Sequence, residues 1–258
     1  MREIILNETS KAAKLLSDEA RVGDVKVAIS LLMRYDVQAA KIEPDAAARH
    51  VRQAVRSMYP AVNQARIDRL VDHYAAHATD CPLSNINGVP ITQSEMDVVL
   101  GRDGIRAKCL TFALLALAKF DTMRCPGIDY WYNGERLAEL VRRADLVLND
   151  DELCYTLHGL YQDGYIGLSE RVDNCSLHVL FAETDGDPVM MLNEQDYKNL
   201  GYCLRAYLGG GYKRCEECGC WIKQNGRGQP RKFCQDCAAT SCRDSKSAYM
   251  RRIRTATF

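Results

Sequence analysis

The sequence has no long hydrophobic run, and this absence argues against a membrane-spanning helix. Its longest apolar stretch, CLTFALLALA at residues 109–118, lies between Lys108 and Lys119. A helix needs about 20 apolar residues to cross a bilayer, so we expect no membrane span. The first residues, MREIILNETSKAAKLL, also lack an apolar core followed by a small-residue cleavage site, which a secretory leader would have. We therefore expect a cytoplasmic protein.

Motifs of common enzymatic chemistry are also absent. No stretch matches a glycine-rich phosphate loop of the GxxxxGK[ST] or GxGxxG form, and there is no nucleophile elbow. His73 and His77 stand four residues apart, but Tyr74 occupies the position of the glutamate in HExxH, so we interpret them as part of an ordinary helix face. The sequence therefore gives no reason to expect an enzyme.

The chain as a whole has no net charge, but its C-terminal segment and the remainder carry opposite net charges. Lys and Arg number 34, as do Asp and Glu, and the formal net charge is zero. From Tyr212 to Phe258, however, there are eleven basic and four acidic residues, which gives this segment a net charge of +7 and leaves −7 upstream. This asymmetry predicts a basic module attached to an acidic body.

Cysteine is abundant, and four of the 12 cysteines have the spacing of metal ligands. They form two CxxC pairs, Cys215 with Cys218 and Cys234 with Cys237. Two such pairs, joined by a spacer long enough to fold, make a four-thiolate Zn²⁺ site. A thiol redox pair is the alternative interpretation, because CxxC also occurs in oxidoreductases. No histidine lies in the segment, so we expect structural rather than catalytic zinc.

The other cysteines have no such pattern. Cys220 and Cys242 lie near the four predicted ligands in sequence but outside the two CxxC pairs. Two interpretations are open for them: either one substitutes for a ligand, or both stay free. In a reducing compartment the rest are most simply small buried or semi-buried residues, namely Cys81, Cys109, Cys125, Cys154, Cys175 and Cys203.

The first predicted domain, residues 1–88, is helical. Apolar spacing favours helices over residues 25–35, from Pro44 to Met58 and from Gln64 to His77. The stretch ATDCPLSNINGVPI at residues 78–91 is rich in Pro, Asn and Gly and is typical of a loop. The domain boundary is therefore predicted within it.

The second predicted domain, residues 89–208, has the element order of a winged helix-turn-helix. Thr92 and Glu95 form a capping-box pattern that opens a short helix. The predicted elements after it are helices at 106–122, 134–144 and 149–162, β-type runs at 165–169 and 177–181, and a helix near 194–207. Three helices followed by a hairpin favour the winged helix.

The third predicted domain, residues 209–258, is the cysteine module. Gly209, Gly210 and Gly211 predict a flexible joint before it. We expect the first cysteine pair in a tight turn, a hairpin from Trp221 to Phe233, and the second pair at the start of a helix. This layout resembles a zinc-ribbon or treble-clef finger. The whole chain is thus predicted to be mainly α with a small β component.

Basic side chains surround the predicted finger and are interleaved with Trp221, Phe233 and Tyr249. Such a surface neutralises phosphates and releases condensed counterions, with little base specificity, so we expect binding to nucleic acid, DNA more than RNA. The alternative is a solvated basic tail. The candidate contacts are Lys213, Arg214, Lys223, Arg227, Arg231, Lys232, Arg243, Lys246, Arg251, Arg252 and Arg254.

The third helix of the predicted winged helix is a poor reader of DNA. Its first residues are Asn149, Asp150, Asp151 and Glu152, and no Lys or Arg lies from residue 149 to residue 162. Carboxylates at this end are repelled by phosphates, whereas DNA readers place polar or basic side chains there. This favours a second hypothesis, in which the acidic winged helix binds a protein partner and the chain is an adaptor or inhibitor with purely structural zinc.

Three segments resemble uncharacterised proteins of phages and other mobile elements of Gram-positive bacteria. They are VPITQSEMDVVLGRDGIRAKCLTFALLALAKF, DELCYTLHGLYQDGYI with its following hairpin, and CEECG…RKFCQDCA, within residues 25–245. The resemblance implies this modular architecture more than a function, because the family has no assigned activity. Together with the basic zinc module, it leads us to expect a regulator or replication accessory factor of a phage or another mobile element. Its members tend to carry lysines where this chain has Asp150 and Asp151.

Overall fold

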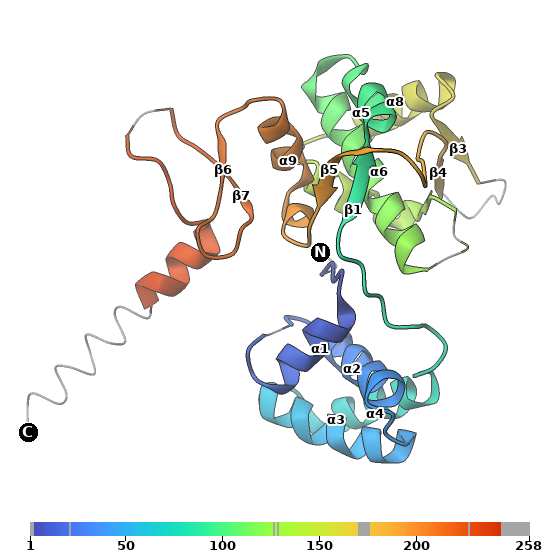
Figure 1. Cartoon of the computed structure of the whole chain (residues 1–258), viewed down its shortest axis with the longest axis vertical. Coiled ribbons are helices and arrows are strands. Elements are labelled where there is room, and N and C mark those ends of the chain that lie inside the picture. Colours follow the sequence, from blue (N-terminus) through green and yellow to red (C-terminus); the bar gives the residue numbers. More distant parts are fainter. Residues whose placement is uncertain are drawn as a thin grey trace, which may run out of the picture. The chain divides into compact units, whose positions relative to one another are not determined.

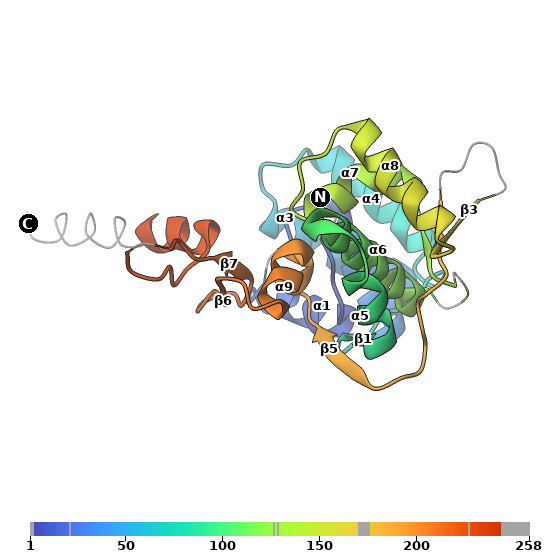
Figure 2. The same ribbon diagram turned by 90° about the horizontal axis from the view of Figure 1, so that it is seen from above.

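The computed structural model describes residues 3–20, 22–125, 127, 129–169, 176–226 and 228–243. The chain is mainly helical, as expected, with small antiparallel sheets (Figures 1 and 2). Four cysteines cluster near its C-terminal end. It forms two compact units, Met1–Gly88 with Met123–Gly127, and Val89–Thr122 with Ile128–Phe258. The predicted division into three domains, with a further boundary at residue 209, stays a prediction.

Short helices build the first unit. They are α1 (Glu8–Leu16), α2 (Val25–Arg34), the π-helix η1 (Tyr35–Ala39), α3 (Pro44–Met58) and α4 (Gln64–Ala76). Helix α2 packs against α1, α3 and α4, and seven of its ten residues are buried. The predicted bounds of α3 are confirmed, because Pro44 occupies the first helical position, where the missing N–H has no partner to lose.

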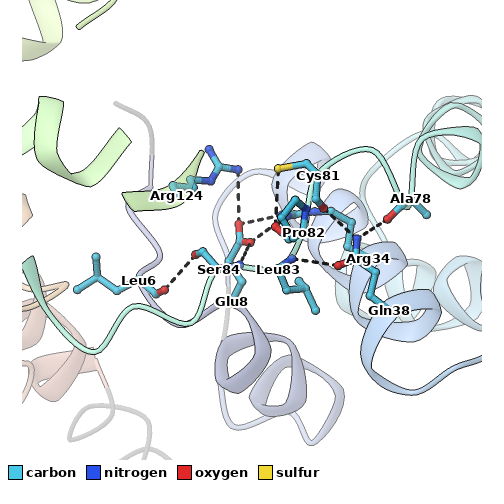
Figure 3. A network of polar contacts seen from close by, with 10 residues as sticks. All are labelled: Leu6, Glu8, Arg34, Gln38, Ala78, Cys81, Pro82, Leu83, Ser84 and Arg124. Carbon is cyan, nitrogen blue, oxygen red and sulfur yellow. Dashed lines mark hydrogen bonds and ion pairs between the residues drawn. The ribbon is translucent and has the colours of Figure 1, made fainter. Parts of the chain in front are cut away.

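A buried carboxylate ties the first unit together (Figure 3). Glu8 is 3 % exposed and accepts two hydrogen bonds of 2.8 Å from the Arg34 guanidinium. The Ser84 N–H donates to the same carboxylate at 2.9 Å, and Arg124, counted with this unit, lies 3.5 Å from it. Gln38 donates to the carbonyls of Ala78 and Cys81. These bonds fix the connecting segment after α4 to α1 and η1.

An apolar helix forms the centre of the second unit. Helix α6 (Gly104–Arg124) is buried from Cys109 to Asp121, as expected for a helix that is apolar on all sides. Lys119 lies 2.6 and 2.9 Å from the carboxylate oxygens of Glu95 on α5 (Gln93–Leu100). Glu95 and Thr92 also complete the predicted capping box. No helix in the described ranges, α6 included, is long and apolar enough to cross a bilayer.

Two helices and a three-stranded sheet follow α6. The elements are β2 (Trp131–Tyr132), η2 (Gly134–Arg136), α7 (Leu137–Arg143), α8 (Asp150–Gln162), β3 (Ile166–Leu168) and β4 (Leu177–Val179). The strands are antiparallel in the order β2-β4-β3. The helices and the strand pair predicted here are confirmed with narrower bounds, and the two-residue β2 is an addition.

The remaining elements correct several predictions. Part of the expected loop at 78–91 belongs to β1 (Val89–Thr92), which pairs with β5 (Pro188–Leu192). The helix expected near 194–207 is divided into η3 (Asp196–Lys198) and α9 (Leu200–Tyr207), because Asn199 caps α9. Cys154, expected to be at least partly buried, is exposed on α8. The last strands are β6 (Tyr212–Arg214) and β7 (Trp221–Lys223).

The Glu8 carboxylate predicts acid sensitivity of the first unit. Burial alone raises the pKa of Glu8, but Arg34, the Ser84 N–H and Arg124 outweigh it and lower this pKa. A lowered folded pKa contributes stability above the ordinary glutamate pKa of about 4.3, and this stability is lost as the pH falls below that value. Glu8→Gln leaves Arg34 without its charge partner, so we expect a loss of about 3–5 kcal/mol at pH 7.

Amide exchange of α1 and α2, measured by mass spectrometry at pH 7 and at several values from about pH 5 down to about pH 2.5, checks this expectation on the full chain. Glu19→Gln, at an exposed position, is the matched control. Similar exchange in Glu8→Gln and the control at neutral pH contradicts the role assigned to Glu8.

Candidate metal centre

A tight turn between β6 and β7 holds the first cysteine pair. The strands pair Tyr212 with Lys223 and Arg214 with Trp221, so residues 215–220 form the connection. The Cys215 N–H donates to the Cys220 carbonyl at 2.8 Å, and the Gly219 N–H donates to the Cys215 carbonyl at 2.9 Å. Gly219 has φ 73°, a left-handed conformation that glycine adopts without strain.

The hairpin is therefore not where the sequence placed it. The prediction assigned it to the stretch from Trp221 to Phe233, but the paired strands flank the first two cysteines instead. The strand that pairs with β7 is β6, which precedes the first cysteine pair, so the hairpin turn contains Cys215 and Cys218. The segment after Lys223 folds back by other bonds: the Gln224 side chain accepts from the Arg231 N–H at 2.8 Å.

The second pair lies at the start of a helix, as predicted for the described part of that helix. Residues 235–243 are helical, and the Ala238 N–H donates to the Cys234 carbonyl at 2.9 Å. The Cys237 N–H donates to the Cys234 sulfur at 3.4 Å. The Cys234 N–H donates to the Cys215 sulfur at 3.3 Å, which joins the two pairs.

The four predicted ligands converge. The sulfur atoms of Cys215, Cys218, Cys234 and Cys237 all lie within 4.8 Å of one another, and those of Cys218 and Cys234 are 3.7 Å apart. Four sulfurs bonded at 2.3 Å around a tetrahedral zinc stand about 3.8 Å apart. The cluster thus has the size of a metal site, and a metal ion fits the four thiols.

Backbone amides favour thiolates at two of the four positions. Burial opposes ionisation of Cys215, but N–H groups of Cys218, Cys234 and Glu217 outweigh it and lower its pKa to about 6. Burial is likewise outweighed at Cys234, whose pKa is lowered by the Cys237 N–H and neighbouring thiols. Burial and the sulfurs of Cys234, Cys218 and Cys215 raise the pKa of Cys237. A metal ion would displace the protons that remain.

The two leftover cysteines differ. Cys220 is buried, at 7 % exposure, and its sulfur lies 3.4 Å from that of Cys218. Cys242 is exposed on the helical residues 235–243. The sequence signal for Cys220 as a fifth thiol was the CGC stretch at residues 218–220. Spacing alone did not predict that the Cys220 sulfur contacts the cluster.

A buried aspartate that the sequence did not indicate fixes the cysteine module to the helical part of the second unit. Asp196 is 1 % exposed, and one of its oxygens lies 2.8 Å from the Trp221 indole nitrogen and 2.6 Å from the Arg214 guanidinium. Arg214 also stands over the Trp221 ring at 4.1 Å. The rings of Tyr202 and Tyr212 lie 4.9 Å apart on α9 and β6. These contacts contradict the prediction that Gly209, Gly210 and Gly211 form a flexible joint before the module.

Some of the residues predicted to contact nucleic acid are exposed on the surface of this module. Lys213, Lys223, Arg231, Lys232 and Arg243 are exposed. Arg214 is exposed at one edge but paired with Asp196. Lys232 lies 3.8 Å from Glu216. The other predicted contacts lie outside the described residues, namely Arg227, Lys246, Arg251, Arg252 and Arg254.

Comparison with protein-family models, with curated proteins and with solved structures finds no match to this chain. The assignment of a role therefore depends on the chemistry of the cluster and its surroundings.

The cluster predicts that each of four cysteines is required for metal binding. Substituting serine at any one position removes a soft sulfur ligand, so we expect loss of tight binding in Cys215→Ser, Cys218→Ser, Cys234→Ser and Cys237→Ser. Cobalt titration, followed by the absorption of tetrahedral cobalt thiolates, measures this. Cys242→Ser is the control and keeps one ion per chain. Unchanged cobalt spectra in the four variants contradict the assignment.

The Asp196 contact predicts that the module loosens without it. Asp196→Ala leaves the Trp221 N–H and the Arg214 guanidinium without their buried acceptor, which costs about 1–3 kcal/mol. Amide exchange of residues 212–223 in metal-loaded protein is expected to accelerate. Glu217→Ala, at an exposed position in the turn between β6 and β7, serves as control. Equal exchange in both variants would mean that Asp196 does not hold the module.

Proposed function

We propose that the chain is a zinc-containing nucleic-acid-binding protein, which acts in the cytoplasm as a regulator or replication accessory factor of a phage or another mobile element. The observation that carries the proposal is a four-thiol cluster whose surroundings are exposed and basic. Four thiolates in a tetrahedron favour Zn²⁺ over the harder cations that prefer oxygen ligands. The mobile-element context comes from the sequence resemblance and stays a proposal.

The zinc in this proposal is structural. The buried hydrophobic cluster of the module consists of Cys215, Cys220 and Ile222, with three further cysteines packed against it. So small a core does not stabilise a fold by itself, and a zinc ion supplies the missing free energy. The hairpin turn with one ligand pair and the helix start with the other support a treble-clef or zinc-ribbon arrangement.

The basic surface gives the module its proposed activity. Besides Arg214, which pairs with Asp196, five exposed Lys and Arg side chains lie among the described residues of 213–243, and their charges attract phosphates without reading bases. Zinc holds their backbone in place, so removing it disperses the charges along an unfolded segment. Binding should therefore depend on zinc and on salt.

We also propose that α6, α7 and α8 with their sheet are a winged helix. A short β2 between α6 and α7 and the strand order β2-β4-β3 after α8 support this assignment. The fold is a common DNA reader, which makes duplex DNA the first substrate to test. Helix α8 itself is a poor candidate for the groove, because Asp150, Asp151 and Glu152 form its first turn.

A second candidate function is favoured by the exposed surface of α8. Tyr155 is 82 % exposed and Tyr161 is 45 % exposed, on the same helix that begins with the three carboxylates. Aromatic side chains beside acidic ones suit a protein partner that offers a basic segment, by charge complementarity. In this alternative the chain is an adaptor or inhibitor, and the zinc module only stabilises it.

The test is a titration of zinc-loaded protein with fluorescent duplex DNA, single-stranded DNA and RNA at two salt concentrations. We expect tight binding at low salt that chelation abolishes. The variant Lys213→Ala/Lys223→Ala/Arg231→Ala should bind more weakly, with a log–log salt slope smaller by roughly 2–3, because up to three phosphate contacts are lost.

A matched control removes the same charges elsewhere. Lys14, Lys26 and Arg49 are exposed in the first unit, and their replacement by alanine also deletes two lysines and one arginine. This control should bind as the unaltered protein does. Equal weakening in both variants contradicts a specific role of the module. Absence of binding to all three nucleic acids at low salt rejects the first function and leaves the second.

A further inference from the structure

A fifth thiol lies against the four proposed ligands. The Cys220 sulfur is 3.4 Å from the Cys218 sulfur, and Cys220 is 7 % exposed. The Cys220 carbonyl accepts the Cys215 N–H at 2.8 Å, so the position of this residue is set by the same turn that presents the ligands. The close approach is therefore a property of the folded turn.

Cys220 does not belong to the set of four convergent ligands. The group in which every sulfur lies within 4.8 Å of every other contains Cys215, Cys218, Cys234 and Cys237 without it. Structural zinc sites are closed at four ligands, so a fifth thiolate has no vacant position. Its place beside Cys218, with Cys234 also in reach of its thiol, needs another explanation.

The pair Cys218 and Cys220 has the arrangement of a reactive thiol and a resolving thiol. Their sulfur atoms need only approach from 3.4 Å to about 2.05 Å to form a disulfide. Gly219 between them has φ 73° and carries no side chain that would obstruct the closure. Cys218 is partly exposed, whereas Cys215 is buried, so an oxidant meets Cys218 more easily. Oxidant-sensing cysteines commonly stand next to such a resolving cysteine.

We propose that Cys218 and Cys220 form an oxidative modification site, at which hydrogen peroxide converts the zinc centre into a disulfide form; this inference rests on the proposed zinc site. The Cys218 thiolate attacks one peroxide oxygen, the O–O bond breaks, and a sulfenic acid and hydroxide form. The Cys220 sulfur then displaces the sulfenic oxygen as water, and the S–S bond forms. The two sulfurs together lose two electrons, and peroxide gains them.

The modification removes a ligand from the metal. A disulfide sulfur is a far weaker ligand than a thiolate, so zinc keeps three ligands and dissociates. The module then loses its stabilising ion and, with it, the arrangement of exposed basic side chains. Cys220 also protects the site, because an unresolved sulfenic acid is oxidised further to sulfinic acid, which is not reduced by thiols.

The experiment uses the full chain, whose zinc content is first measured without oxidant. Protein treated with peroxide is alkylated and digested with trypsin and a glutamate-specific protease, which together release the peptide CGCWIK, residues 218–223. We expect this peptide to lack both alkyl groups and to be lighter by two hydrogen atoms. Its amount should follow the zinc released to a chromogenic chelator, and dithiothreitol with added zinc should restore the metal centre.

Two variants complete the test. Cys220→Ser should bind zinc normally before oxidation but lose the recovery by dithiothreitol, because Cys218 proceeds to the sulfinic acid. Cys242→Ser should behave as the unaltered protein. Full alkylation of the peptide in protein that has lost zinc, a disulfide to Cys234 instead, or full recovery of Cys220→Ser overturns the inference. A chain that binds no zinc before oxidation refutes the proposed centre, and the peptide from this metal-free chain still decides whether the thiols pair.

Discussion

Four sulfur atoms within 4.8 Å of one another are the constraint on which the C-terminal part of the chain depends. Around them, the described residues of 212–243 bury little besides cysteines and Ile222, so apolar burial contributes few kcal/mol there. A zinc ion bound by four thiolates contributes about 10–16 kcal/mol in small zinc modules. The proposed nucleic-acid surface, the hairpin and the helix start are consequences of this single convergence.

The cysteine module is not an independent appendage. Asp196, on η3, binds the side chains of Arg214 and Trp221, and these two residues directly flank Cys215 and Cys220 in sequence. Metal binding and docking therefore act on the same two strands, and each should stabilise the other. The same contact pairs the positive charge of Arg214 with Asp196, so the proposed contacts with phosphates fall to the other exposed cations of the module. The acidic first turn of α8 is the surface that the second proposed function assigns to a protein partner.

Local sequence patterns predicted much of this structure. The features that depend on pairing between distant segments were not predicted. The CxxC spacing identified all four convergent thiols, and the capping signal at Thr92 located the start of α5. β1 escaped prediction because its partner lies about 100 residues away and its sequence contains a proline. Asp196 gave no signal, since its burial results from tertiary contacts alone. The hairpin was misplaced because its first strand precedes the cysteines instead of following them.

X-ray absorption at the zinc edge of the purified full chain is the sharpest test of the four-sulfur metal centre, because it reports the metal, the ligand type and the bond length together. We predict one zinc per chain with four sulfur ligands at about 2.3 Å. A first shell that contains nitrogen or oxygen atoms, or protein that retains no zinc, would contradict it.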